Sequence, residues 1–177
     1  MAVYFTADTH LGHVNIIKYC SRPFADILSM NEAIFDFWNQ TVKPEDTVYH
    51  LGDVVFKEKE DLIKKIKKLP GKKFLIPGNH DSNFSLLSEA FTIKESLTEI
   101  SINKVKFILC HYPLLTWNAF FYGSMHFFGH VHGKIPPTNQ RIDVGVDSWG
   151  FAPVRCEVLL SAAQNFPKHL NPEIGSS

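Results

Sequence analysis

The stretch AVYFTADTH, residues 2–10, sets the pattern that organises this chain. An apolar run typical of a buried strand, AVYFTA at residues 2–7, leads directly into the polar signature Asp8-Thr9-His10. In open α/β sheets, ligands bind at the edge formed by the carboxyl ends of the strands. The stretch therefore predicts a strand that delivers Asp8 and His10 to a binding site.

The same pattern recurs four more times along the chain. The later runs are TVYHL (47–51), KKFLI (72–76), VKFIL (105–109) and MHFF (125–128). Their polar signatures are Gly52-Asp53, Gly78-Asn79-His80-Asp81, His111 and Gly129-His130-Val131-His132. Each signature alone is weak, but their number, order and shared context predict a metal site assembled at one edge of a sheet.

The segments between these runs indicate helices in the first half and strands in the second. Ser29 and Glu32 predict a capping box for a helix with residues 33, 34, 37 and 38 on one face. Helices are also predicted over 57–69 and 82–90. In the second half, a hairpin is predicted at Asn103-Lys104, strands are predicted over 142–146 and 154–160, and long helical patterns are absent.

This order of elements predicts the fold class and the extent of the domain. Strands that alternate with helices imply parallel pairing, and the later strands imply a second sheet. We expect an α/β fold in which two packed mixed sheets are flanked by helices, an αββα sandwich. A single domain is predicted over residues 1–164, and residues 165–177 are predicted to be a frayed tail.

Composition excludes several classes of protein. The 18 basic residues balance the 18 acidic ones, so no global field draws the chain to nucleic acid or membrane. No apolar stretch approaches the ~18 residues of a membrane span, and the N-terminus does not resemble a secretory signal. Three widely spaced cysteines disfavour a disulfide framework or a Cys-based zinc site. The expected location is the cytoplasm.

The five signatures, from Asp8 to about His132, resemble those of the calcineurin-like metallophosphoesterase superfamily. The order in that family is D-x-H, G-D, G-N-H-D/E, a lone His and G-H-x-H. One departure is Val54-Val55-Phe56, because many members carry a polar residue soon after the Asp of G-D. The segments Ser21–Phe24 and Asp143–Asp147 resemble small, uncapped bacterial or phage members.

The resemblance implies a site for two divalent ions. Asp53 would bridge them, Asp8, His10 and His132 would complete one position, and Asn79, His111 and His130 the other. Such mixed oxygen and nitrogen ligands suit Mn²⁺, which we expect, or Fe or Zn. His80 resembles the non-ligand histidine that protonates the leaving oxygen, and Asp81 is expected to hold its other ring nitrogen.

The function that follows is metal-dependent hydrolysis of phosphoester bonds by attack of a metal-bridging hydroxide. A phosphodiester is favoured because an uncapped site should be open, and the aromatic residues of the 113–125 loop favour a nucleotide or a nucleic-acid end. The partner would be a phosphoester substrate such as a nucleotide or a nucleic-acid end, and no protein partner is evident. The alternatives are a phosphomonoesterase, a nuclease and a non-catalytic scaffold, which we expect to have lost ligands.

Residues outside the signatures leave alternatives open. His13 is expected to face the substrate or to cap a helix. Arg22 is expected to bind phosphate or to form a surface salt bridge. The lysines of 57–73 read as a solvated helix face rather than a nucleic-acid track. Four aromatic residues of the 113–125 loop, expected to border the site, would either stack on a base or pack as core; they are Trp117, Phe120, Phe121 and Tyr122.

Overall fold

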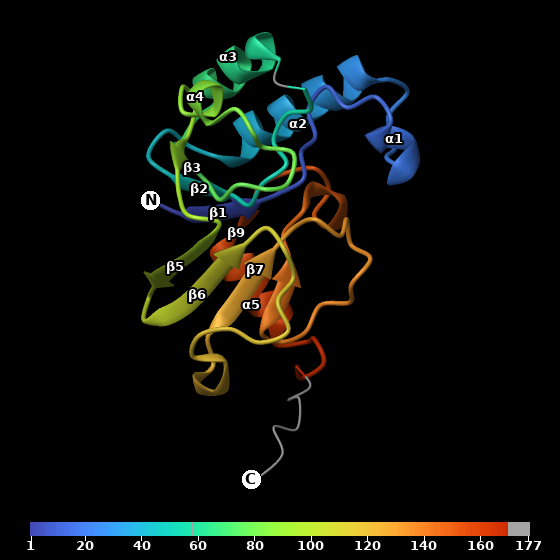
Figure 1. The fold of residues 1–177 in the computed structure, drawn as a ribbon. Coiled ribbons are helices and arrows are strands. Elements are labelled where there is room, and N and C mark those ends of the chain that lie inside the picture. The colour runs from blue at the N-terminus through green and yellow to red at the C-terminus, as the bar shows by residue number, and fades with distance from the viewer. Residues whose placement is uncertain (58, 170–177) are drawn as a thin grey trace.

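The computed structural model describes residues 1–57 and 59–169. It confirms the predicted fold class, two mixed sheets flanked by helices (Figure 1). The first sheet has the order β4-β3-β2-β1-β9, with β1 (Val3–Thr6), β2 (Thr47–His50), β3 (Lys72–Leu75), β4 (Thr92–Ile93) and β9 (Val154–Arg155). The second has the order β5-β6-β7-β8, with β5 (Leu97–Ile102), β6 (Val105–Cys110), β7 (Met125–Phe128) and β8 (Arg141–Asp143).

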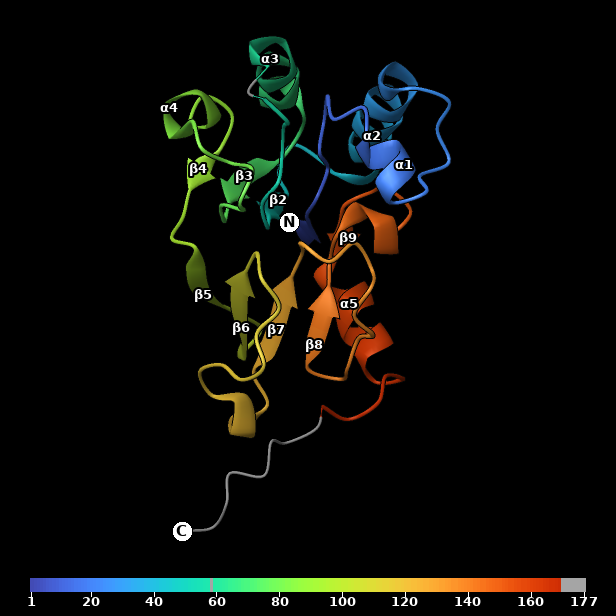
Figure 2. The same cartoon turned by 45° about the vertical axis from the view of Figure 1, so that its right-hand side comes forward.

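The register of the parallel strands brings the predicted signatures to one edge. In the first sheet Thr6 pairs with His50, and His50 pairs with Leu75, so β1, β2 and β3 end side by side. In the second sheet Leu109 pairs with Phe127, and β5 and β6 form the predicted hairpin. Because each polar signature follows one of these strand ends within three residues, all five lie at the edge where the carboxyl ends of the two sheets come together (Figure 2).

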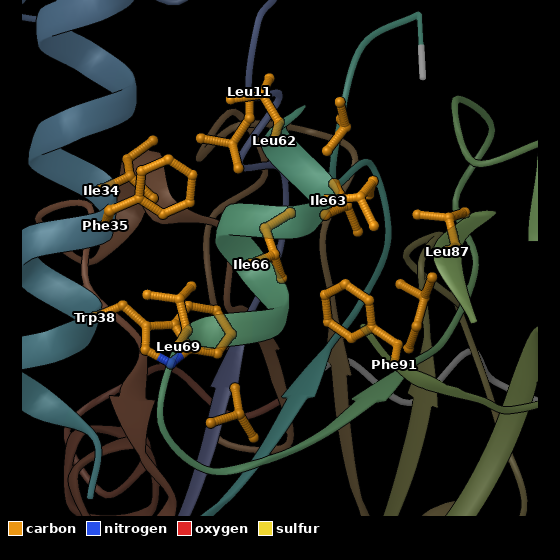
Figure 3. Close-up of a cluster of buried hydrophobic side chains, with 14 of the residues drawn as sticks. Leu11, Ile34, Phe35, Trp38, Leu62, Ile63, Ile66, Leu69, Leu87 and Phe91 are labelled. Atoms are coloured by element: carbon orange, nitrogen blue, oxygen red, sulfur yellow. The ribbon is translucent and has the colours of Figure 1, made fainter. Parts of the chain in front are cut away.

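Helices cover the outer face of the first sheet. They are α1 (Ile16–Tyr19), α2 (Ile27–Thr41), α3 (Glu60–Lys68) and α4 (Phe84–Leu87). Ile34 and Trp38 of α2 pack with Ile66 of α3 in the cluster of Figure 3. The predicted cap of α2 is wrong by three residues, because Asp26 rather than Ser29 is the N-cap and exchanges hydrogen bonds with Ser29. No helix of the described residues is long and apolar enough to cross a membrane.

A second core lies between the sheets and includes a helix that the sequence reading missed. Phe5 of β1 contacts Phe127 of β7 edge-on, with ring centroids 4.9 Å apart. The strand predicted over 154–160 stops at Arg155 and continues as α5 (Cys156–Ala163). The buried residues Cys156, Leu159 and Ala163 lie at helical spacing, and short apolar runs of this kind fit a strand or a helix equally well.

The aromatic loop covers the outer face of the second sheet. Trp117 packs against His126 of β7, with ring centroids 5.1 Å apart, and Phe120 is buried. Its short 3-10 helix η1 (Phe120–Tyr122) lies at the end of the sheet opposite the signatures (Figure 1). The expectation that Trp117, Phe120, Phe121 and Tyr122 border the site is therefore wrong, and Trp117 and Phe120 pack as core.

The predicted domain boundary at residue 164 does not coincide with the end of the packed chain. Phe166 packs against the core between the sheets, and the amide of Asn139 donates to the carbonyl of Pro167 at 2.9 Å. Residues 165–169 of the predicted tail are thus part of the fold. Residues 170–177 of that tail lie outside the described residues.

Candidate metal centre

The turns after β1 and β2 are joined by backbone hydrogen bonds. The amide of Asp8 donates to the carbonyl of Gly52, and the amide of His10 donates to the carbonyl of Asp53, each at 3.0 Å. Parallel pairing thus continues past the strands themselves. Two carboxylates from signatures far apart in the sequence are consequently fixed in the same small volume.

Glycines in the signatures allow these turns to approach closely. Gly52 has a φ of +91°, and a Cβ placed there would lie 2.5 Å from the nitrogen of Gly78. A Cβ on Gly129 would lie 2.7 Å from Oδ2 of Asp8. A side chain at either position would push apart the loops that carry the polar residues, which gives the glycines of these motifs a physical reason.

The backbone of the site adopts an unusual conformation at the side chains that point inward. Left-handed φ values occur at Asp8 (57°), His10 (46°), Asp53 (59°), His130 (72°) and His132 (50°). Such values cost on the order of 1–3 kcal/mol for a residue with a Cβ and persist only where the surroundings impose them. The fold itself therefore aims these side chains into the site.

The predicted metal ligands converge in two groups. The ligand atoms of Asp8, His10 and His132 lie within 4.8 Å of one another, and so do those of Asp53, His111 and His130. Asp53 lies between the groups, with Oδ2 at 3.5 Å from Nε2 of His10 and 3.4 Å from Nε2 of His111. Oδ1 of Asn79 lies 3.1 Å from Nε2 of His111 and 3.0 Å from Nδ1 of His130.

The hydrogen bonding of these side chains is consistent with a site for divalent ions. Neither ring nitrogen of His10 has a hydrogen-bond partner within the described chain, although both are buried. Nδ1 of His111 is 2.7 Å from the carbonyl of Leu51 and donates to it, so the neutral imidazole has its lone pair on Nε2. That lone pair faces the oxygens of Asn79 and Asp53, and a cation among such acceptors satisfies all of them at once.

Burial and charge also shift the pKa values in the site. Burial raises the pKa of Asp8 to about 7 and lowers the pKa of His10 to about 3, so the imidazole of His10 is neutral near pH 7. Burial alone would raise the pKa of Asp53, but the hydrogen bond and charge of His111 lower it. At His111, the hydrogen bond and negative charge of Asp53 outweigh the effect of burial and raise the pKa of the imidazole.

His80 and Asp81 do not form the predicted pair. The carboxylate of Asp81 accepts from the backbone amides of Gly78 (2.9 Å), Asp53 (2.7 Å) and Val54 (3.0 Å), and it is buried. It therefore ties the third signature to the second instead of holding the ring of His80. The ring of His80 is exposed, with its centroid 5.3 Å from that of His10, and its backbone amide donates to Oδ1 of Asp53 at 2.9 Å.

The structure also corrects the substrate role expected for Arg22. Its side chain is fully buried, and all five N–H donors are engaged with Asp147, Met30 and the carbonyls of Asp8 and Thr9. No donor is left for a phosphate. Neither expected role fits, because the ion pair that Arg22 forms with Asp147 is in the interior.

An open cavity of about 670 Å³ lies over the ligand groups. His13 lines it and stacks flat on Phe56, with ring centroids 3.9 Å apart and an angle of 9° between the planes. Tyr19 approaches His13 edge-on at 6.2 Å. Lys134 lines the cavity as well. The cavity thus combines a polar floor with a partly aromatic wall.

Comparison with known proteins assigns the chain to a family. A sequence model described as calcineurin-like phosphoesterase matches residues 1–141. The chain belongs to the calcineurin-like phosphoesterase family. This match confirms the resemblance read from the five signatures, and it establishes a phosphoesterase family for the chain.

Individual proteins resemble the chain in sequence or in fold. The protein MJ1445 of Methanocaldococcus jannaschii is 33% identical over 167 residues, which cover 89% of each chain. The structure of AQ665 from Aquifex aeolicus matches with a TM-score of 0.74 and 27% identity, over 91% of this chain and 98% of that one. Yfce, a phosphoesterase from E. coli, shares the fold at 15% identity and a TM-score of 0.55, over 82% and 78%.

Several residues of this calcineurin-like phosphoesterase site were not predicted from the sequence. Phe56 belongs to Val54-Val55-Phe56, the segment that departs from the family pattern, and it supplies part of the aromatic wall. Asp143 accepts from the amides of Gly133 and Gly145, and so anchors the loop of the last signature. Asp143 and Asp147 lie in a segment noted only for its resemblance, while Tyr19 and Lys134 had no sequence signal.

Proposed function

We propose that this protein is a metal-dependent phosphodiesterase acting on nucleotide-type substrates. The observation that carries the proposal is the convergence of two ligand groups on either side of Asp53 beneath an open cavity. Two divalent ions held there, most favourably Mn²⁺, would supply a bridging hydroxide as nucleophile and would offset the charge of the phosphate. Asp8, His10 and His132 would hold one ion, with Asn79, His111 and His130 holding the other.

His80 is the proton donor in this proposal. It lines the cavity, is exposed to the substrate side, and is attached through its amide to the bridging Asp53. A proton placed on the leaving oxygen removes the charge that develops there as the P–O bond breaks. Asp81 acts one step further away, because its carboxylate fixes the backbone of Asp53 and Val54 rather than the ring of His80.

The aromatic wall supports the nucleotide part of the proposal. A phosphate over the ligand groups would place one of its substituents along His13, Phe56 and Tyr19, where a planar base finds a stacking surface. Tyr19 is 64% exposed, so its ring is accessible. A diester fits the open cavity, because its second substituent can extend towards solvent.

A hydrolysis panel in the presence of Mn²⁺ tests the activity. It compares an aryl phosphate monoester, an aryl diester, cyclic nucleotides and short oligonucleotides. We expect turnover of the diesters, lost together with bound metal in Asp53→Asn and retained in Asp36→Asn, a matched change on the exposed face of α2. Preference for the monoester would replace the diesterase by a phosphomonoesterase, and no turnover on any substrate would favour a scaffold.

A second comparison tests the aromatic wall alone. Stacking is worth ~1–3 kcal/mol per base, so Tyr19→Ser should lower kcat/KM for a nucleoside cyclic phosphate by ~5–150-fold. The same cyclic phosphate on ribose without a base should be unaffected. Phe121→Ser serves as control, because Phe121 is 62% exposed but does not line the cavity. An equal loss on both substrates would remove the stacking role.

A further inference from the structure

We propose that Arg22 and Asp147 are positioning residues that orient His132 and so set the affinity of one metal position, that of Asp8, His10 and His132. This inference rests on the proposed function, because it assumes that the position binds a divalent ion. It assigns a role to two residues whose contacts are internal and which do not themselves face the cavity.

Arg22 is the fixed point of the arrangement. Its Nε donates to Oδ1 of Asp147 and its Nη2 donates to Oδ2, each at 2.8 Å, in a bidentate pair. The same Nη2 donates to the carbonyl of Asp8 at 2.7 Å, and Nη1 donates to the carbonyl of Thr9 at 3.1 Å. One buried guanidinium therefore ties the first signature to Asp147 on the 3-10 helix η2 (Val146–Ser148).

Asp147 in turn holds His132, a proposed metal ligand, by a hydrogen bond. Its Oδ2 lies 2.7 Å from Nδ1 of His132. A proton held on Nδ1 by this carboxylate leaves the lone pair on Nε2, the nitrogen available to the group of Asp8 and His10. The carboxylate thus sets both the tautomer and the direction of the imidazole, while Arg22 keeps the carboxylate in place.

The two metal positions differ in this support. At the other position, Nδ1 of His111 faces the carbonyl of Leu51 and Nδ1 of His130 faces Oδ1 of Asn79. Both partners are neutral. A carboxylate raises the basicity of a ligating imidazole more than a neutral acceptor does. Among the described ligand histidines, His132 alone bonds to a carboxylate through Nδ1, so only its position should respond to Asp147.

A different use of the same residues is less consistent with the contacts. Cys20, His132 and Asp147 also place ligand atoms within 4.8 Å of one another, a spacing that suits a separate metal ion. Both oxygens of Asp147, however, already accept from Arg22, and Oδ2 also faces His132. An ion bound there would lie against a guanidinium that cannot lose its charge. The contacts therefore favour orientation of His132.

This support lies outside the five signatures. Asp147 follows residue 141, where the calcineurin-like match ends, whereas Arg22 lies within the match, in the loop between α1 and α2. Arg22 and Asp147 are 125 positions apart in the chain. The last signature therefore depends on a contact between two segments that its own motif does not contain.

A Mn²⁺ titration monitored by calorimetry tests this inference. In Asp147→Asn the new NH2 group must replace one of the two oxygens that accept from Arg22 and His132, so at least one hydrogen bond is lost. We expect two sites in the wild type and, in the variant, one site weakened by ~10–100-fold while the other is unchanged. Glu157→Gln is the matched control, because it breaks an exposed ion pair with Arg155 at 3.4 Å.

The outcomes separate this inference from the proposed function. A wild type that binds no Mn²⁺ removes the proposed function itself. A wild type with two sites and an Asp147→Asn variant with the same two affinities overturns the positioning role alone. If the variant does not fold, ¹⁵N NMR spectra of the histidines in the metal-free wild type test the positioning role instead. The signal that is absent from the spectrum of His132→Gln is assigned to His132. We expect this signal to show the Nδ1–H tautomer, and an Nε2–H tautomer would contradict the positioning role of Asp147.

Discussion

The second sheet carries a cluster of histidines and aromatic rings at each end, and the two clusters differ in their hydrogen bonding. At the signature end, His111 and His130 contact Tyr112, with ring centroids 5.1 and 4.8 Å apart. At the opposite end, His126 and His169 contact Trp117 at 5.1 and 5.2 Å. Residue types and ring contacts are almost the same in both places.

The difference lies in where the ring nitrogens point. Nδ1 of His126 faces the carbonyl of Ile108 at 2.9 Å, and Nε2 accepts from the amide of Leu114 at 3.0 Å, so backbone groups satisfy the whole ring. At the signature end, Nε2 of His111 and Nδ1 of His130 face the side-chain oxygen of Asn79 instead. His10, which joins the site from the first sheet, has no hydrogen-bond partner at either nitrogen within the described chain. A buried ring without partners, more than histidine content, distinguishes a binding site from a packed interior.

The largest expected effect tests the signature end. His80→Ala should lower kcat by ~10²–10⁴-fold, the usual range for a general acid, and most strongly for substrates with poor leaving groups. Mn²⁺ stoichiometry by calorimetry should stay at two, although His80 lies within 4.8 Å of ligand atoms of His10 and Asp53. His169→Ala at the other end should leave kcat unchanged. Loss of an ion in His80→Ala would make His80 a ligand instead.

A change at the opposite end should affect stability alone. His126→Ala leaves the buried carbonyl of Ile108 and the half-buried amide of Leu114 without their partner. Each such group costs ~1–3 kcal/mol, so the free energy of unfolding measured with urea in EDTA should fall by that order. kcat/KM under folding conditions should not change. A comparable loss of kcat/KM would show that the two ends are coupled.

The pH dependence of stability should come partly from the same residue. Burial lowers the pKa of His126 from 6.5 to about 4, so below pH 6.5 the unfolded chain binds a proton that the folded chain does not. Stability is then complete above pH 6.5 and is lost by ~1.4 kcal/mol per pH unit as the pH falls towards 4. Between pH 7 and 5, urea unfolding of the wild type should lose ~2 kcal/mol more than His126→Gln, which does not titrate. Equal losses of unfolding free energy in the wild type and in His126→Gln would exclude His126 as a source of the pH dependence.

The smallest effect is expected at the tip of the aromatic loop. Tyr122 is 92% exposed, and an exposed substitution of this kind changes stability by less than ~0.5 kcal/mol. Tyr122→Ser should therefore leave both urea unfolding and kcat/KM for the nucleoside cyclic phosphate at wild-type values. A higher KM in this variant would bring the loop back as part of the substrate site.

The strand ends were predictable because periodicity and polarity change abruptly there. Apolar runs that end in Asp, His or Asn predicted β1, β2, β3, β6 and β7, and with them the side chains that meet in the site. The hairpin at Asn103-Lys104 followed from turn chemistry, since both residues have left-handed φ values of 49° and 69°. These features depend on neighbours in the sequence.

What was missed depends on partners far along the chain. Asp81 was expected to hold the adjacent His80, but its oxygens reach backbone amides of the preceding signature. Arg22 was assigned to the substrate or the surface, yet its partner lies 125 residues away. The aromatic loop was placed by its position between two signatures, although a connection between parallel strands must return to the other end of the sheet. Sequence distance was a poor guide in each case.

The left-handed backbone at five of the seven proposed ligands has a consequence for protein engineering. Glycine adopts this conformation without strain, so a redesign that selects only for thermal stability should favour glycine at Asp8, His10, Asp53, His130 and His132. Each exchange would relieve strain while deleting a ligand. A library screened without a metal-binding selection would therefore drift towards a more robust protein with no active centre, and these five positions should be held fixed.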